Sequence, residues 1–265
     1  MEPINLSRRA FAGGLASLAG AALLPSGAGA AGGTSEIRVA FVGDSLSDGM
    51  WGGATRLVAR EACLNARVKL GRFAENGTGL TRPAKFDWVA EGRAVVAKFK
   101  PTLSVVSLGL NDRQSIVDTS RSRFELGTPG WRARYGELSQ ALARNLRAEE
   151  GAVLWIGLPV LRDKVSQDDA AEKNVIFAEA IKGLGDPRIR FVAPWRQGAA
   201  GPDAFHPYGA DLRGAQVQLR APDGIHFTTA GYDVVSSYLL GAVAGFLKEQ
   251  GQAMTYPCHA QQAQR

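Results

Sequence analysis

Short apolar runs rich in β-branched residues alternate with segments of helical periodicity, and this alternation constrains the fold more than any other feature of the chain. Each run is bounded by glycine, proline or polar residues, which is typical of a buried strand. The predicted strands are residues 37–42, 68–73, 103–108, 152–157 and 189–192. Helices are predicted at about 54–66, 86–99, 131–149, 168–184 and 228–250. Strands that alternate with helices form a parallel sheet covered on both faces, so the expected fold is one α/β domain.

The first 30 residues are expected to lie outside this domain. Paired arginines, Arg8 and Arg9, precede a weakly apolar run from Phe11 to Leu24, and Ala28-Gly29-Ala30 matches a small-x-small cleavage site. The arginines stand in an S-R-R-x-F context, which resembles a twin-arginine export signal. The run is too short and too weakly apolar to span a bilayer core of roughly 30 Å. We therefore expect a periplasmic or secreted protein, cleaved near Ala30, with a single domain over 31–265.

The rest of the sequence limits the kinds of partner that this domain is expected to bind. No other apolar run approaches spanning length, so stable membrane insertion after cleavage is not expected. The formal net charge is +6, and it falls to about +5 when the leader is removed with its two arginines and Glu2. A basic exported protein is consistent with a place near anionic envelope polymers, although a solvated surface without a special partner explains the charge equally well. Lysine and arginine form no cluster interleaved with aromatic residues, which argues against nucleic acid as a partner.

Cys63 and Cys258 are the two cysteines of the chain. An oxidising compartment would permit a disulfide between them, and this bridge would tie the C-terminal tail to the first helix. The pair lacks the C-x-x-C spacing of a redox or metal site, so its pairing is left open by the sequence.

Polar and glycine-rich turns follow the first three predicted strands. Ser45 lies in Gly43-Asp44-Ser45-Leu46-Ser47-Asp48-Gly49, directly after the first strand, while Gly79 and Asn111 follow the second and third. Ligands of parallel α/β sheets bind at the carboxyl ends of the strands, so these three residues are expected to share one rim. A serine held there is rigid and accessible, as a nucleophile must be. The alternative is that Asp44 and Ser45 simply cap the next helix.

An activated serine needs a base and a group that orients the base. The chain has three histidines. His259 lies in the terminal tail and His206 in a polar loop, where a surface role is the simpler interpretation. His226 follows Asp223 by three residues, and Gly224 between them permits a turn that returns the carboxylate to Nδ1 of the ring. Nε2 would then be free to accept the serine proton. Alternatively, Asp223 caps a turn and His226 packs beneath it.

Negative charge that develops on an acyl oxygen needs preset donors. The candidates are the backbone N–H groups of Ser45 and Gly79 and the side-chain amide of Asn111. Glycine lets a backbone approach a ligand closely, and asparagine supplies N–H donors without charge. Both residue types also populate turns for purely structural reasons.

Taken together, these segments resemble the four blocks of the SGNH (GDSL) hydrolase superfamily, in the family's order and across most of the mature chain. The blocks are Gly43-Asp44-Ser45-Leu46, the turn with Gly79, Gly109-Leu110-Asn111-Asp112 and Asp223-Gly224-Ile225-His226. In the second block, Gly77 is an alternative to Gly79. The α/β-hydrolase family is disfavoured because the chain contains no G-x-S-x-G.

The resemblance implies a flavodoxin-like three-layer α/β/α sandwich with about five parallel strands, and ester or acyl-transfer chemistry. It implies Ser45 as nucleophile, His226 as base and Asp223 as its partner, with Ser45, Gly79 and Asn111 around the oxyanion. Such chemistry requires no metal and no cofactor. The sequence also looks like an exported bacterial branch that carries Arg-Pro and Asp-Trp after the second block and Arg-Gln after the third, here Arg82-Pro83, Asp87-Trp88 and Arg113-Gln114.

Related exported members act on O-acetyl groups of cell-wall or secreted polysaccharides. The sequence thus predicts a serine esterase or O-acyltransferase whose partner is an acylated carbohydrate or another small ester. Side chains expected on the acceptor side are Trp51, Arg82, Trp88 and Arg113, with core packing or surface exposure as the alternative for each. Two rival hypotheses are a non-catalytic glycan-binding envelope protein and a lipid esterase.

Overall fold

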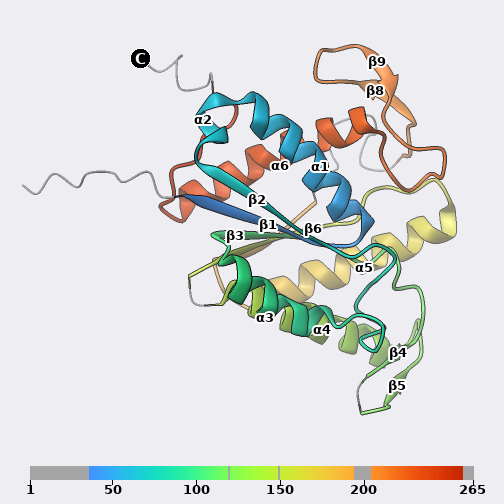
Figure 1. Cartoon of the computed structure of the whole chain (residues 1–265). Helices are drawn as coiled ribbons and strands as arrows, with labels where there is room; N and C mark the ends of the chain where they lie inside the picture. Colours follow the sequence, from blue (N-terminus) through green and yellow to red (C-terminus); the bar gives the residue numbers. More distant parts are fainter. Residues whose placement is uncertain (1–35, 119, 149, 194–203, 259–265) are drawn as a thin grey trace, which may run out of the picture. The chain divides into compact units, whose positions relative to one another are not determined.

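A five-stranded parallel sheet forms the centre of the fold (Figure 1). The computed structural model describes residues 36–118, 120–148, 150–193 and 204–258, so the predicted leader and His259 lie outside the described residues. The sheet has the order β2-β1-β3-β6-β7, and every neighbouring pair is parallel. Its strands are β1 (Ile37–Gly43), β2 (Val68–Ala74), β3 (Leu103–Ser107), β6 (Ala152–Ile156) and β7 (Ile189–Val192). All five strands predicted from the sequence are therefore present.

Helices cover both faces of this sheet, as Figure 1 shows. One face carries α1 (Ser45–Arg60), α2 (Ala62–Asn65) and α6 (Thr229–Glu249), and the other carries α3 (Trp88–Phe99), α4 (Pro129–Arg147) and α5 (Lys164–Lys182). The three-layer α/β/α prediction is confirmed. The strand order is that of flavodoxin-like sheets, in which β1 and β3 flank the point where the order reverses and ligands bind.

The first helix begins at Ser45 rather than at Ala54, so the predicted start is wrong. Glycines at 49, 52 and 53 argue locally against a helix, but tertiary packing needs two of them. A Cβ atom on Gly49 would lie 2.0 Å from the Tyr232 ring, and one on Gly53 would lie 2.4 Å from Ser236 Oγ. These glycines let α1 approach α6 closely, and the packing compensates for their poor helix propensity.

Helix α6 corrects the expectation that no apolar run outside the leader approaches the length of a membrane span. It has a mean hydropathy of 1.3 over an 18-residue window, which makes it long and apolar enough to match a membrane span by length and composition. In this fold, however, 56% of that window is buried. Leu239, Leu240 and Val243 belong to the core beneath it. The apolar character of α6 is thus explained by its packing against α1 and the sheet.

Two small antiparallel hairpins project from the sandwich. In one of them β8 (Tyr208–Ala210) pairs with β9 (Gln216–Gln218). β4 (Ile116–Val117) pairs with β5 (Arg123–Phe124) in a segment where the sequence indicates only a polar loop. Strands of two residues are too short to show any periodicity, and this hairpin was therefore missed.

A disulfide joins Cys63 at α2 to Cys258 after α6, with an S–S distance of 1.98 Å. The bridge settles the pairing that the sequence leaves open. Bonded sulfurs are not thiolates, so the neighbouring Glu61 carboxylate does not form a cysteine metal site with them.

We expect the Cys63→Ala/Cys258→Ala variant to lose about 2–5 kcal/mol of unfolding free energy, because the bridge closes a long loop and constrains the unfolded chain. Denaturant unfolding of the oxidised protein and of the double variant measures this loss. Wild type treated with a reductant should unfold like the variant. Equal midpoints for the oxidised protein and the variant would show that the bridge does not contribute to stability.

Candidate active site

The carboxyl end of β1 places Ser45 at the first turn of α1. Asp44 caps the helix, since its side chain accepts a hydrogen bond of 3.1 Å from the backbone N–H of Leu46. The Asp44 backbone N–H in turn donates to the Ser107 carbonyl at the end of β3, at 3.1 Å. The alternative capping role is therefore confirmed for Asp44. It also fixes the backbone that presents the Ser45 hydroxyl at the rim.

Ser45, His226 and Asp223 form a continuous hydrogen-bonded chain. Ser45 Oγ lies 2.7 Å from His226 Nε2, across 181 positions of sequence. His226 Nδ1 lies 2.7 Å from Asp223 Oδ2. If Nδ1 carries the proton and donates it to the carboxylate, Nε2 is an acceptor for the serine hydroxyl. The structure thus brings together the three residues to which the sequence assigns nucleophile, base and orienting acid.

The turn between Asp223 and His226 is held by the carboxylate itself. Asp223 Oδ1 accepts hydrogen bonds from the backbone N–H groups of Ile225, at 2.8 Å, and His226, at 2.9 Å. Gly224 supplies the left-handed backbone that this turn requires, with φ of +77°. Burial opposes ionisation of Asp223, but the bonds from the His226 ring and the two N–H groups outweigh it and lower the pKa of Asp223 to about 2. The carboxylate therefore stays charged across the physiological range.

Arg220 fixes the loop that carries the acid and the base. Its side chain is buried, and it donates to the carbonyls of Val160, at 2.8 Å, and Ile225, at 2.9 Å. Its guanidinium also stacks 4.4 Å from the centre of the Phe227 ring. Burial lowers the pKa of Arg220 to about 10, which leaves the group charged near neutral pH. Sequence reasoning missed Arg220, because one arginine in a polar segment carries no signal of burial.

Asp112 joins the second and third sequence blocks. Its buried carboxylate accepts hydrogen bonds from Leu80 N, Thr81 N, Thr81 Oγ1 and Tyr135 Oη, at 2.7–3.0 Å. A Cβ atom on Gly79 would lie 2.1 Å from Asp112 Oδ1, so only glycine permits this contact. Asp112 is the last residue of the third block, but the sequence predicts no role for it. Its carboxylate holds the Gly79 turn against the end of β3.

The three predicted oxyanion donors lie at the adjoining ends of β1, β2 and β3. Asn111 Nδ2 donates to the Thr78 carbonyl at 3.0 Å and has only a long contact, 3.5 Å, with Asp44 Oδ2. Within the described part of the chain, the backbone N–H groups of Ser45 and Gly79 have no hydrogen-bond partner. Gly79 and Asn111 line a cavity of about 230 Å³, to which Gly77 also contributes. Gly77 is exposed, whereas Gly79 is the buried glycine beside Asp112.

Trp88 does not lie where a substrate would meet it, and Trp51 is half-buried. Trp88 is 2% exposed, and its indole N–H donates to Thr78 Oγ1 at 2.9 Å. It is a core residue that supports the Gly79 turn from behind, so the expected substrate contact is wrong for Trp88. Trp51 lies in α1, packs against the core and buries its indole N–H without a partner among the described residues.

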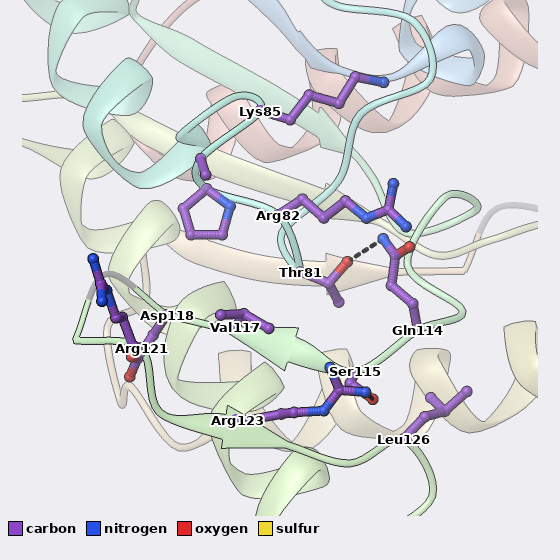
Figure 2. A pocket seen from close by; sticks show the side chains of 12 residues that line it. Thr81, Arg82, Lys85, Gln114, Ser115, Val117, Asp118, Arg121, Arg123 and Leu126 are labelled. Carbon is purple, nitrogen blue, oxygen red and sulfur yellow. Dashed lines mark hydrogen bonds between the residues drawn. The ribbon is translucent and has the colours of Figure 1, made fainter.

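Arg82 and Arg113, both predicted on the acceptor side, differ in whether they line a cavity near the site. Arg82 is exposed and lines the 230 Å³ cavity together with Gly79 and Asn111. It also lines a larger neighbouring cleft, shown in Figure 2. Arg113 is exposed but contributes to neither of these two cavities. Among the four expected acceptor-side residues, Arg82 is the one that the structure places beside the candidate oxyanion donors.

Asp44 is a fully buried carboxyl group behind Ser45. Burial is the main cause that raises its pKa to about 7, and the nearby Asp112 carboxyl adds to the effect. Backbone N–H groups of Leu46, Gly109 and Leu110 oppose the shift without cancelling it. Between about pH 4 and 7 the folded protein therefore holds a proton that the unfolded chain has released, so this group's contribution to stability falls as the pH rises through that window.

We expect Asp44→Asn to remove this pH dependence while it keeps the helix cap, since asparagine caps helices as well as aspartate does. The unfolding free energy of wild type relative to Asp44→Asn should decrease from pH 4 to pH 7.5, by up to about 4 kcal/mol for a shift of about three units. Denaturant unfolding of both proteins at several pH values measures the difference. A difference that stays constant across the window would contradict the raised pKa.

Comparisons with known proteins identify the family and the fold of the chain. A model of the family described as "Protein of unknown function (DUF459)" matches residues 38–242. No protein in a search of curated sequences matches the chain. An acetyl esterase structure has 12% identity and a TM-score of 0.55, covering 80% of this chain and 99% of that chain.

Two further solved structures show the same fold. A carbohydrate esterase of family 3 from Talaromyces cellulolyticus has 13% identity and a TM-score of 0.54, covering 80% of this chain and 99% of its own. Axe2, an acetylxylan esterase from Geobacillus stearothermophilus, has 13% identity and a TM-score of 0.52, covering 79% and 94%. Because the family model matches well over half of the chain, the chain belongs to the DUF459 family, and its fold is that of these esterase structures.

Proposed function

We propose that the protein is an exported serine esterase or O-acyltransferase that acts on acyl esters, chiefly acetyl esters, of cell-envelope or secreted polysaccharides. The observation that carries the proposal is the hydrogen-bonded chain from Ser45 Oγ through the His226 ring to Asp223, with 2.7 Å at both steps. A serine, a histidine and a carboxylate in this order form the arrangement that activates a hydroxyl as a nucleophile.

In the first half-reaction, Ser45 Oγ attacks the ester carbonyl carbon while its proton passes to His226 Nε2. The imidazolium that forms is stabilised by Asp223, which remains ionised because its pKa is lowered to about 2 by the hydrogen bonds described above. The tetrahedral intermediate then collapses. The C–O bond to the sugar breaks, the leaving alkoxide takes the proton from His226, and an acyl-serine remains.

The proposed donors to the developing oxyanion are the backbone N–H groups of Ser45 and Gly79 and the side-chain amide of Asn111. The N–H groups of Ser45 and Gly79 are unoccupied among the described residues, and the second hydrogen of the Asn111 amide makes only the 3.5 Å contact with Asp44. The bond from Asn111 to the Thr78 carbonyl holds the amide in place before substrate binds. Ser45 also begins a 16-residue helix, whose N-terminal partial charge favours a negative group at this point.

In the second half-reaction, a water molecule or a sugar hydroxyl gives a proton to His226 Nε2 and attacks the acyl carbon. The bond between that carbon and Ser45 Oγ then breaks, and Ser45 Oγ takes the proton from His226. Water yields the free acid, and a sugar hydroxyl yields a transferred acyl group. The acetyl class is supported by the folds that resemble this one, since an acetyl esterase and an acetylxylan esterase share the architecture. Export is supported by the twin-arginine-type leader and by the Cys63–Cys258 bridge, because disulfides persist in oxidising compartments.

Turnover of a graded series of esters tests this proposal. The purified mature domain should release 4-nitrophenol from the acetyl ester faster than from esters of longer fatty acids, and it should release acetate from an O-acetylated glycan. A sugar acceptor that lowers the acetate yield while it gains the acetyl group identifies transfer. Preference for long acyl chains would support the lipid esterase instead, and failure to cleave any ester while binding glycans would support the non-catalytic alternative.

A further inference from the structure

A basic cleft lies beside the candidate active site and has no part in the mechanism above. It encloses about 1010 Å³ between the loop after β2 and the β4–β5 hairpin. Figure 2 shows Arg82 and Lys85 on the loop side and Arg121 and Arg123 on the hairpin side. We use the name basic cleft for this cavity, whose lining residues include these four cations and the single carboxylate Asp118.

The charges of the basic cleft are only partly neutralised by the protein. Asp118 accepts hydrogen bonds from Ser120 and Ser122 in its own turn and lies 3.8 Å from Arg134, outside the lining. Arg123 pairs with Glu125. The side chains of Arg82 and Arg121 are exposed and form no ion pair with any carboxylate among the residues that the structure describes. Two guanidinium groups without a carboxylate partner, one on the loop after β2 and one on the hairpin, create an attractive potential for anions along the basic cleft.

The basic cleft adjoins the cavity that Gly79 and Asn111 line. Arg82, Lys85 and Gln114 line both spaces. Gln114 is held by two hydrogen bonds, to Thr81 Oγ1 at 2.8 Å and to the Asn111 carbonyl at 3.2 Å, and the first of these is drawn in Figure 2. A chain that enters the basic cleft can therefore extend past Gln114 to Asn111 without leaving the surface.

The other residues that line the basic cleft suit sugar rings better than nucleic-acid bases. Val117 and Leu126 are 43% and 40% exposed and offer aliphatic surface to the C–H faces of a pyranose ring. Thr81, Gln114 and Ser115 offer hydroxyl and amide groups for sugar hydroxyls. None of the described residues that line the basic cleft is aromatic, whereas proteins that hold single-stranded nucleic acid stack its bases on aromatic rings.

From this we infer that the substrate is an anionic O-acylated glycan: the acylated sugar sits at Ser45 and the carboxylate or phosphate groups of neighbouring sugars bind between Arg82 and Arg121. The inference rests on the proposed function for the reaction and adds the class of glycan. Guanidinium groups suit it because they bind carboxylate and phosphate oxygens with paired N–H donors.

The test compares acetylated polygalacturonate with acetylated xylan, an anionic and a neutral glycan, in the same enzyme preparation. The ratio of the two kcat/KM values cancels any change in the acyl chemistry. We expect wild type to favour the anionic glycan, and Arg82→Gln/Arg121→Gln to reduce the ratio about tenfold, as two partly exposed charge contacts would. High salt should reduce the wild-type ratio in the same direction, since exposed charges are screened.

Arg93→Gln is the matched control, because Arg93 is an exposed arginine on α3 away from the basic cleft. It should leave the ratio at the wild-type value. A wild-type ratio near one, or a double variant with the wild-type ratio, would overturn the inference even while 4-nitrophenyl acetate is still cleaved. Failure of the wild type to cleave 4-nitrophenyl acetate would overturn the proposed function alone.

A binding experiment with a protein that lacks the nucleophile tests the inference without any catalysis. Calorimetry with the Ser45→Ala protein and de-esterified polygalacturonate should show binding that is lost in the variant that also carries Arg82→Gln and Arg121→Gln. A phosphorylated mannan in a parallel titration identifies which anion is preferred. Absence of binding to both polymers would overturn the inference.

Discussion

The Ser45→Ala variant is expected to turn over a small acetyl ester at least about 10³-fold more slowly than wild type, because it removes the atom that attacks the carbonyl. The fold should be unaffected, since Ser45 is only half-buried and its hydroxyl contacts the His226 ring. Initial rates with 4-nitrophenyl acetate, corrected for spontaneous hydrolysis, measure the effect. The loss should appear in kcat, because the hydroxyl acts in the transition state.

Ser47→Ala provides a matched control two residues along the same helix. Ser47 Oγ is buried and has no hydrogen-bond partner among the described residues, so its removal leaves no polar group unpaired. This variant should retain wild-type turnover. If Ser45→Ala also retained it, the proposed mechanism would be wrong whatever the geometry of the site.

The Asp112→Ala variant is expected to lose on the order of 4 kcal/mol of unfolding free energy, because four buried donors lose their acceptor. These donors are the N–H groups of Leu80 and Thr81, the Thr81 hydroxyl and the Tyr135 hydroxyl. Activity at low temperature should fall as well, since the carboxylate positions the Gly79 turn. Denaturant unfolding measures the first effect, and kcat of the still-folded fraction measures the second.

Asp168→Ala is the control for Asp112→Ala. Asp168 is an exposed carboxylate on α5 that pairs with Lys164, and such pairs contribute little. Its removal should change the unfolding free energy by less than about 1 kcal/mol. Equal stability of the Asp112 and Asp168 variants would show that the buried hydrogen bonds of Asp112 do not hold the second and third blocks together.

Most of the sandwich is predictable from the sequence because its three central strands, β1, β3 and β6, are buried on both sides. Runs such as 103–108 and 152–157 are mostly apolar, short and bounded by turn residues, and the structure places strands there with ends shifted by one residue. The start of α1 was not predictable, since Gly49 and Gly53 are poor helix formers until Tyr232 and Ser236 of α6 occupy the space beside them. Tertiary packing overrode local propensity.

Some residues of the candidate site were also predictable from the sequence, and others were not. Ser45, Asp223 and His226 were identifiable because their residue types and order carry a chemical pattern, and the distances between them follow from the fold. Asp112 and Arg220 act on other residues through buried hydrogen bonds, which leave no trace in composition or spacing. Trp88 was misplaced for a related reason, because a tryptophan near a loop looks the same in sequence whether it meets substrate or the core.

Reaction with a fluorophosphonate tests the central claim, that the Ser45 hydroxyl is activated by the His226 ring, more directly than any other measurement. The purified protein should gain one phosphonyl group, mapped by mass spectrometry to the peptide that contains Ser45. His226→Ala should slow the labelling at least about 10²-fold, because the hydroxyl then has no base. Labelling of another residue, or labelling of Ser45 at the same rate without the imidazole, would contradict the account.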